Sequence, residues 1–351
     1  MDNTEEAYPV APTAGAAHKC ASCGVSLFQA DERRTPLCET CREHFIKYPF
    51  PVWVKIFGGA VLLLLLVALS SLPRSIGVGI HYKRGQVAEE KHNYFTAQKE
   101  LETVVRKEPS FIDARCRLMI AAFYNTDFTA MGAAYKDLEG KKIEDNALYK
   151  EVNQVMDASN IYFPTDSFSS FVKRYSVPKT DIPVADYYKY LDSNTHDAYA
   201  CLHIANLLYD QEKYTECDSL LNEALGNDRH YLSALALKMP LKQEMGELDS
   251  SIFYSNRILD INHEYTYAYA SRVKALLKQK KDAEALQWAK KGMAIDDKDP
   301  YMQGCMALAY HFNNDAKNRD AILSKAPPDS ITLTVMAGIK DIVSGKEKFR
   351  D

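Results

Sequence analysis

The amino-acid sequence predicts an all-α fold, a superhelix of helical hairpins preceded by a transmembrane helix and a small cysteine-rich head. Three observations predict it. Four cysteines lie within 22 residues near the N-terminus, a stretch of 18 residues without a charge follows them, and small and apolar residues then recur every 34 residues. The chain has 351 residues, of which 46% are hydrophobic and 26% charged, and this composition excludes a protein embedded in the membrane throughout its length.

The charge balance bears on possible partners. Lysine and arginine number 43 and aspartate and glutamate 47, which gives a formal net charge of -4. Nucleic-acid-binding proteins usually carry a positive field, so the bulk charge argues against a nucleic-acid partner. Residues 1–17, rich in alanine, proline, threonine and glutamate, predict a disordered tail.

The head covers residues 18–46 and contains two C-x2-C pairs, Cys20 with Cys23 and Cys38 with Cys41, separated by 14 residues. Each pair offers two thiolates from one tight turn, where Gly24 suits a left-handed conformation, and two such turns facing each other give four tetrahedral sulfur ligands. The pattern resembles the zinc-ribbon and B-box-like knuckles of small metal-binding domains. This resemblance implies one zinc ion held by the four cysteines.

A structural role is expected for this zinc. Fewer than 50 residues precede the apolar stretch, too few for a stable core, and a bound metal supplies folding free energy that burial cannot supply. A site closed by four thiolates also leaves no coordination position for a substrate. Two alternatives stay open: a Cys3His set that uses His18 or His44, and redox cycling of the two pairs as disulfides.

The transmembrane helix is predicted at residues 52–73. As a helix, Val52 to Leu72 spans about 30 Å, the thickness of a hydrocarbon core, with Trp53 and Lys55 at one interface. A buried core helix is the alternative, and five consecutive leucines argue against it. A cleaved signal peptide is disfavoured because the segment starts after residue 50.

Flanking charges leave the membrane orientation open, with five basic residues between 32 and 55 and four between 74 and 92. We expect a cytoplasmic head and extracytoplasmic repeats, because thiolates that await zinc persist best in a reducing compartment. Four scattered cysteines count against this orientation, because an oxidising compartment disfavours unpaired thiols unless they are buried. They are Cys116, Cys201, Cys217 and Cys305.

The 34-residue period covers residues 78–145 and 198–326. In the clearest copy, 198–231, small residues stand where two antiparallel helices would touch: Ala205 at position 8, Cys217 at position 20 and Ala224 at position 27. The copy resembles a tetratricopeptide repeat, which implies stacked helix pairs with a concave groove. Lys238 and Arg272 occupy position 7, which is normally apolar, so the packing of their repeats is uncertain.

Two segments break the period. Residues 146–197 contain Pro164, Pro178 and Pro183 and predict an irregular connecting segment, with one possible helix over 149–162. The alternative is a boundary between two separate superhelical domains. Residues 327–351 are predicted to be a C-terminal tail.

First-helix positions 2, 5, 9 and 12 would line the concave groove and bind a protein partner. The alternative is that the tyrosines there simply pack between helices. The predicted groove residues are Tyr199, Leu202, Asn206, Tyr209, Tyr267, Lys274, Tyr301, Leu308 and His311.

The sequence lacks phosphate-binding loops, nucleophile elbows and zinc-protease motifs, so no enzyme and no small-molecule substrate are predicted. A hydrolase within 146–197 ranks last, because Ser167, Ser169 and Asp166 have no nearby histidine. The leading hypothesis is a membrane-anchored adaptor or scaffold that crosses the lipid bilayer once and binds protein partners through its groove. The alternative is a redox- or metal-responsive regulator of a membrane enzyme.

Overall fold

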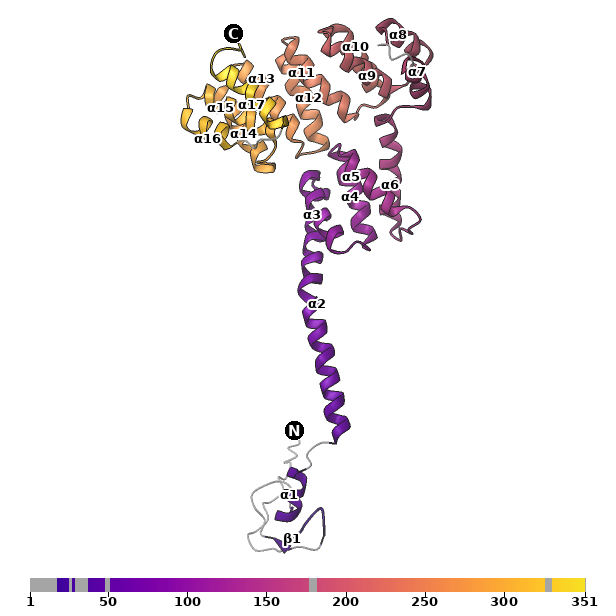
Figure 1. Cartoon of the computed structure of the whole chain (residues 1–351), viewed down its shortest axis with the longest axis vertical. Coiled ribbons are helices and arrows are strands. Elements are labelled where there is room, and N and C mark those ends of the chain that lie inside the picture. Colours follow the sequence, from indigo (N-terminus) through magenta and orange to yellow (C-terminus); the bar gives the residue numbers. More distant parts are fainter. Residues whose placement is uncertain are drawn as a thin grey trace, which may run out of the picture. The chain divides into compact units, whose positions relative to one another are not determined.

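The computed structural model describes residues 18–24, 27–28, 37–47, 51–176, 182–325 and 330–350. They belong to two compact units, Met1–Ser75 and Ile76–Asp351, here called the N-terminal and the C-terminal unit. Figure 1 labels the strand β1 and the helices α1 to α17. The predicted disordered tail, residues 1–17, lies outside the described residues.

The first described elements of the N-terminal unit are two short antiparallel strands, β1 (His18–Lys19) and β2 (Leu27–Phe28), in which His18 pairs with Phe28. The helix α1 (Glu39–Lys47) follows, and then α2 (Val52–Glu90) starts. Along residues 52–67 of α2 the large apolar side chains are exposed, except for the partly buried Val54. Within the part of the chain that the structure describes, no helix is both long and apolar enough to cross a membrane. The predicted span 52–73 extends over side chains 68–73, which lie outside the described residues.

The C-terminal unit is built from helix pairs that follow the 34-residue frame of the sequence. First helices begin at residues 112, 198, 232, 266 and 300, and second helices begin at residues 94, 128, 214, 248, 282 and 316. This regular spacing confirms the tetratricopeptide-like, all-helical architecture of the repeats. The helices are α3 (Tyr94–Lys107), α4 (Ile112–Tyr124), α5 (Phe128–Leu138), α9 (Ala198–Asp210), α10 (Tyr214–Asn227), α11 (Leu232–Glu244), α12 (Leu248–Ile261), α13 (Thr266–Lys278), α14 (Asp282–Ile295), α15 (Pro300–Phe312) and α16 (Ala316–Lys325).

The turn between the two helices of a repeat has the same backbone conformation in six repeats. One residue, at position 15 of the frame, takes a positive φ each time. Only one of the six is a glycine, although side chains disfavour this region. The six residues are His92, Thr126, Glu212, Gly246, Lys280 and Asn314.

Small residues let the paired helices approach closely. Ala97, Ala205, Ala224 and Ala285 are completely buried, as expected for positions where helix meets helix. In the first repeat the close approach is at Gly85, where an added Cβ would lie 2.8 Å from Cγ of Leu101. The C-terminal part of α2 therefore serves as the first helix of that repeat.

The two aperiodic segments are more regular than the sequence predicts. The described residues of 146–197 hold three α-helices and a single 3-10 turn rather than an irregular connection, because Pro164 precedes α7 and Pro183 is the N-cap of α8. The predicted tail 327–351 contains α17, which packs on α15 where Gly304 leaves room for Val335 and Ile339. The added elements are α6 (Asn146–Ser159), η1 (Asn160–Tyr162), α7 (Asp166–Ser176), α8 (Val184–Ser193) and α17 (Ser330–Val343).

The charged residues at position 7 are accommodated by partners on neighbouring helices. Lys238 on α11 is 0% exposed, and its Nζ donates hydrogen bonds to Asp218 Oδ1 at 2.7 Å and to Asn222 Oδ1 at 2.6 Å, both on α10. The guanidinium of Arg272 lies 3.7 Å from the ring centre of Trp288. A buried charge is tolerated when it is paired and hydrogen-bonded, so these repeats pack normally despite their unusual sequence.

We predict that Asp218→Ala lowers the free energy of unfolding by about 3–5 kcal/mol, because it leaves the buried Lys238 ammonium without its counter-charge. Glu223→Ala, an exposed site on the same helix, should change stability by less than about 0.5 kcal/mol. Urea unfolding of both variants measures the difference. Equal midpoints would contradict the ion-pair interpretation.

The same pair sets a pH dependence. Burial raises the pKa of Asp218, but hydrogen bonds from Lys238 and Lys242 outweigh it and hold the pKa below its usual value. A depressed pKa contributes stability above the pKa of the unfolded chain, about 3.9, and this contribution is lost as the pH falls through the lower folded value. The stability gap between wild type and Asp218→Ala should therefore shrink below about pH 4.

Candidate functional site

The four predicted metal ligands come together in the N-terminal unit. The sulfur atoms of Cys20, Cys23, Cys38 and Cys41 all lie within 4.8 Å of one another. A tetrahedral zinc–thiolate site with bonds of about 2.3 Å requires sulfur–sulfur separations of about 3.8 Å. The Cys23 and Cys38 sulfurs are 3.8 Å apart, so the cluster has the size that a metal ion needs.

The two cysteine pairs are presented by different backbone structures. Cys20 and Cys23 belong to a turn closed by a hydrogen bond from Gly24 N to Cys20 O at 2.8 Å, with Gly24 at φ 69°. Cys38 immediately precedes α1 and Cys41 lies in its first turn, where Arg42 N donates to Cys38 O at 2.9 Å. A helix start thus replaces the second knuckle, which explains why no glycine follows Cys41.

Backbone donors shape the acidity of these thiols. The pKa of Cys20 is lowered to about 6, chiefly by the backbone N–H of Cys23 and then by that of Cys38, which lies 3.3 Å from the Cys20 sulfur. The pKa of Cys41 is raised to about 12, chiefly through the hydrogen bond that its side chain shares with Cys38. The lowered pKa favours the thiolate form of Cys20, and a metal cation at the centre would favour deprotonation of the other three thiols.

Part of the predicted groove forms a real pocket in the C-terminal unit. It has a volume of about 550 Å³ and is lined by the first helices of four successive repeats. The predicted residues in its wall are Tyr209, Tyr267, Lys274, Tyr301 and Leu308. Burial raises the pKa of Tyr267 to about 12, so its hydroxyl stays protonated near neutral pH.

Several other residues that line this pocket were not predicted, because they lie in the segment interpreted as a C-terminal tail. They include Val335, Ile339 and Ile342 on α17 and the following residues Glu347 and Phe349. The tail is fixed by Arg350, which donates to the Leu277 carbonyl at 2.6 Å and to the Asp282 carboxylate. The spacing of Val335, Ile339 and Ile342 is an amphipathic pattern that would have predicted this helix.

Four predicted groove residues lie elsewhere. Tyr199 packs its ring against Phe168 of α7, 5.5 Å between centroids, and Leu202 joins the same apolar cluster. Asn206 is exposed and donates to the Leu202 carbonyl of its own helix. His311 is half-buried, with Nδ1 3.3 Å from Arg319 Nη1.

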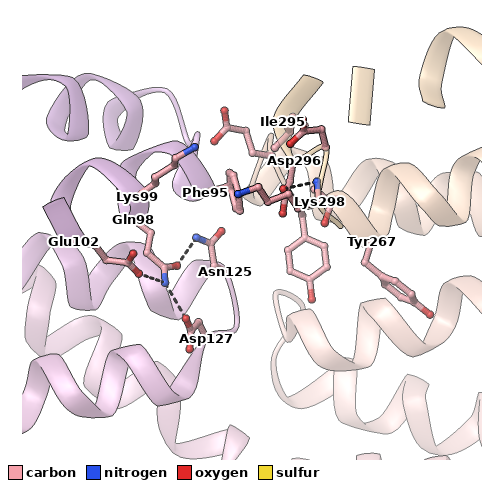
Figure 2. Close-up of a pocket in the computed structure, with 14 residues that line it drawn as sticks. Phe95, Gln98, Lys99, Glu102, Asn125, Asp127, Tyr267, Ile295, Asp296 and Lys298 are labelled. Atoms are coloured by element: carbon pink, nitrogen blue, oxygen red, sulfur yellow. Dashed lines mark hydrogen bonds between the residues drawn. The ribbon is translucent and has the colours of Figure 1, made fainter. Parts of the chain in front are cut away.

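A second cavity, of about 590 Å³, was not predicted at all. Figure 2 shows its residues facing each other from two parts of the chain, with Gln98 and Asn125 on one side and Asp296 and Lys298 on the other. Gln98 Nε2 donates to Asp127 Oδ2 at 2.8 Å and Asn125 Nδ2 donates to Gln98 Oε1 at 2.8 Å. Tyr267 lines both this cavity and the groove.

Comparison with known proteins adds only weak likenesses of fold. No protein-family model and no curated protein sequence matches the chain. Among solved structures, a tetratricopeptide repeat protein from Parabacteroides merdae ATCC 43184 has 12% identity over 75% of this chain and 99% of its own, at a TM-score of 0.38.

Two further structures are similar at the same low level. YrrB, a TPR protein with an unusual peptide-binding site, has 16% identity over 59% of this chain and 97% of its own, at a TM-score of 0.36. Yeast Tom70 has 11% identity over 72% of this chain and 60% of its own, at 0.39. With all three TM-scores below 0.5, these likenesses carry no argument about function, and the fold assignment rests on the helix pairs themselves.

Proposed function

We propose that the protein is a membrane-anchored, non-catalytic scaffold that holds a segment of a partner protein in the groove of its C-terminal unit. The observation that carries this proposal is the pocket in which Tyr209, Tyr267, Lys274 and Tyr301 meet, because these side chains come from three different repeats. Tyrosine combines a large apolar face with a polar tip and is enriched at binding hot spots.

The groove favours a segment that carries a carboxylate. Among the described residues, Lys274 Nζ has no hydrogen-bond or ion-pair partner, whereas the buried Lys238 and Lys242 are both paired. Lys278, also in the groove, lies 3.7 Å from Glu244. An ammonium group without an ion-pair partner, in a pocket that is also lined by tyrosines able to donate hydrogen bonds, suits an acidic side chain or a chain terminus.

The exposed apolar surface of α2 supports the membrane anchor. Val52, Trp53, Ile56, Phe57 and every residue from 61 to 67 are each at least 40% exposed. A continuous exposed apolar surface of this kind is unfavourable in water. At the centre of a bilayer, by contrast, each leucine, isoleucine, phenylalanine or valine favours insertion by about 0.3–0.6 kcal/mol. We propose that this helix crosses the membrane once, over the predicted residues 52–73.

The burial of the scattered cysteines supports extracytoplasmic repeats and a cytoplasmic head. All four are 0–1% exposed, and burial raises the pKa of Cys201 to about 12 and that of the other three to about 11. Buried thiols of this kind are inert toward oxidation. The four are Cys116, Cys201, Cys217 and Cys305.

Zinc is the metal proposed for the head, because four thiolates in a closed tetrahedral arrangement suit it and leave no catalytic position. Bound there, it would supply folding free energy to a unit in which, among the described residues, Cys20 and Cys38 are the buried ones. The alternative function, a redox- or metal-responsive regulator, is favoured by one feature, the exposure of Cys23.

We predict that the purified full chain binds one equivalent of zinc under reducing conditions, and that Cys38→Ser lowers this to well below one, measured by metal analysis. The variant Cys116→Ser, a matched change outside the cluster, should still bind one equivalent of zinc. A chain that folds normally without zinc would contradict the structural role. Release of zinc by mild peroxide and its recovery on reduction would instead support the regulator.

We predict that a photo-crosslinking amino acid in place of Tyr301 captures a partner in native membranes, and that Lys274→Glu reduces the yield at least tenfold, because the new carboxylate would repel the ligand's own. The matched control is Tyr135 on α5, 45% exposed against 44% for Tyr301 and outside the groove. Equal yields from positions 135 and 301, or no effect of Lys274→Glu, would contradict the groove proposal.

We predict that Lys346→Cys reacts with a membrane-impermeant maleimide in intact cells, whereas Glu5→Cys reacts only after the membrane is opened. Lys346 is 76% exposed, and the buried native thiols of the C-terminal unit should give little background. The opposite labelling pattern would place the repeats and their partner in the cytoplasm. Labelling of both sites in intact cells would argue against a membrane-spanning chain.

A further inference from the structure

The C-terminal unit contains two arms that are joined at two places. Arm 1 comprises residues 76–159, from the end of α2 to α6, and arm 2 comprises residues 198–350, from α9 onward. Each arm has its own apolar core. Among the described residues, the one apolar side chain packed against the cores of both arms is Tyr162, in the connecting segment.

Tyr162 has the contacts expected of a hinge. Its ring lies 4.8 Å from that of Phe128 on arm 1 and 4.8 Å from that of Tyr231 on arm 2, measured between centroids. Its hydroxyl accepts a hydrogen bond from Leu232 N at 3.0 Å, at the start of α11. Side-chain contacts of Tyr162 therefore hold the two arms together at this junction, where no single helix runs from one arm into the other.

The second junction is polar and joins residues about 170 positions apart in the sequence. Glu264, in the turn between α12 and α13, accepts hydrogen bonds from Thr96 N at 2.7 Å and from Thr96 Oγ1 at 2.8 Å. His263 N donates to His92 O at 2.9 Å. The turn of one arm therefore holds the start of α3 in the other.

Glu264 fulfils a need that α3 does not meet by itself. The N-cap residue of α3, Asn93, makes no side-chain capping hydrogen bond. The third amide of the helix, that of Thr96, would lack an intrahelical acceptor, and a carboxylate at a helix N-terminus is also favoured by the helix dipole. Arm 2 thus caps a helix of arm 1.

Three further hydrogen bonds strengthen the same junction. Asn262 is 0% exposed, and its Nδ2 donates to Tyr124 O at 3.1 Å and to Asn125 Oδ1 at 2.8 Å. Thr126 Oγ1 and Tyr265 Oη are 3.2 Å apart. We call the residues 262–265 with their partners His92, Thr96 and 124–126 the clasp.

We propose that the clasp is a device that opens and closes the superhelix and so sets the width of the cavity between its arms. The cavity of about 590 Å³ is lined by both arms and by Glu264 and Tyr265 of the clasp itself. The clasp consists of a few hydrogen bonds, whereas each arm is held by an extended apolar core, so breaking the clasp costs less free energy than unfolding an arm. Tyr267 borders both this cavity and the groove, and opening therefore also changes one wall of the groove.

Hydrogen exchange of single amides in the full chain tests the proposal. Glu264→Ala, changed on arm 2, should speed exchange at the His263 amide about tenfold or more, although that amide bonds to His92 O and not to Glu264. Asn125→Ala, changed on arm 1, should speed exchange at the Thr96 amide, although its acceptor Glu264 is untouched. The amide of Leu232 at the hinge should keep its rate in both variants.

The matched control is Asp260→Asn, an exposed site close to the same turn without a hydrogen bond across the junction, which should change none of the three rates. If each variant affects only the amide whose own partner was removed, the contacts are independent and no clasp exists. If Leu232 exchanges faster in step with Thr96 and His263, the arms unfold rather than open, and the proposal is also wrong.

Discussion

The close contact between the two helices of each repeat is the constraint on which the C-terminal unit depends. A single helix pair cannot bury its apolar face, and each pair stacks on the next only if its own helices meet at the right distance. Buried alanines at positions such as Ala97, Ala224 and Ala285 set this distance. At position 15 the backbone then turns through a left-handed residue, so that every repeat has the same turn between its two helices. Five of the six residues there are not glycine, and a side chain makes this conformation energetically unfavourable. That cost is tolerated because stacking over-determines the turn.

This local constraint explains which parts of the fold the sequence predicted. Small residues at fixed spacing are visible in one chain, so helix starts at 198, 232, 266 and 300 agree with the frame. Prolines at 164 and 183 indicated a break in the period, but they only separate helices, because proline is tolerated just before or at a helix start. The helix α17 was missed because it stands apart from the repeat pattern and buries its face, at Met336 and Ile339, against α15.

The candidate sites were predicted where they depend on residues close together in the sequence, and missed where they depend on contacts between distant parts of the chain. Four cysteines in two pairs predict a metal cluster directly, because each pair is a local turn. The spatial convergence of Tyr209, Tyr267 and Tyr301 also followed from the frame, whereas the burial of Tyr199 against α7 did not, since it requires a neighbour outside the period. Lys238 illustrates the limit further: its position predicted poor packing, and only the three-dimensional pairing with Asp218 and Asn222 explains why it is buried.

A repeat array ordinarily contacts only its neighbours in sequence, so a junction between residues 96 and 264 changes what the superhelix can do. In an open array, the curvature is set by small rotations between successive repeats, and a ligand can alter it only gradually. When the ends of a segment are joined, the same array has two distinguishable states, with the junction made or broken, and any ligand that prefers one state shifts their populations. The contacts that join it are made by Asn262 and Glu264 in a single turn, and Tyr267 stands three residues beyond Glu264 in the groove. The proposed binding in the groove and the proposed closure of the arms would therefore involve adjoining residues of one short segment, and such an arrangement can couple the two events.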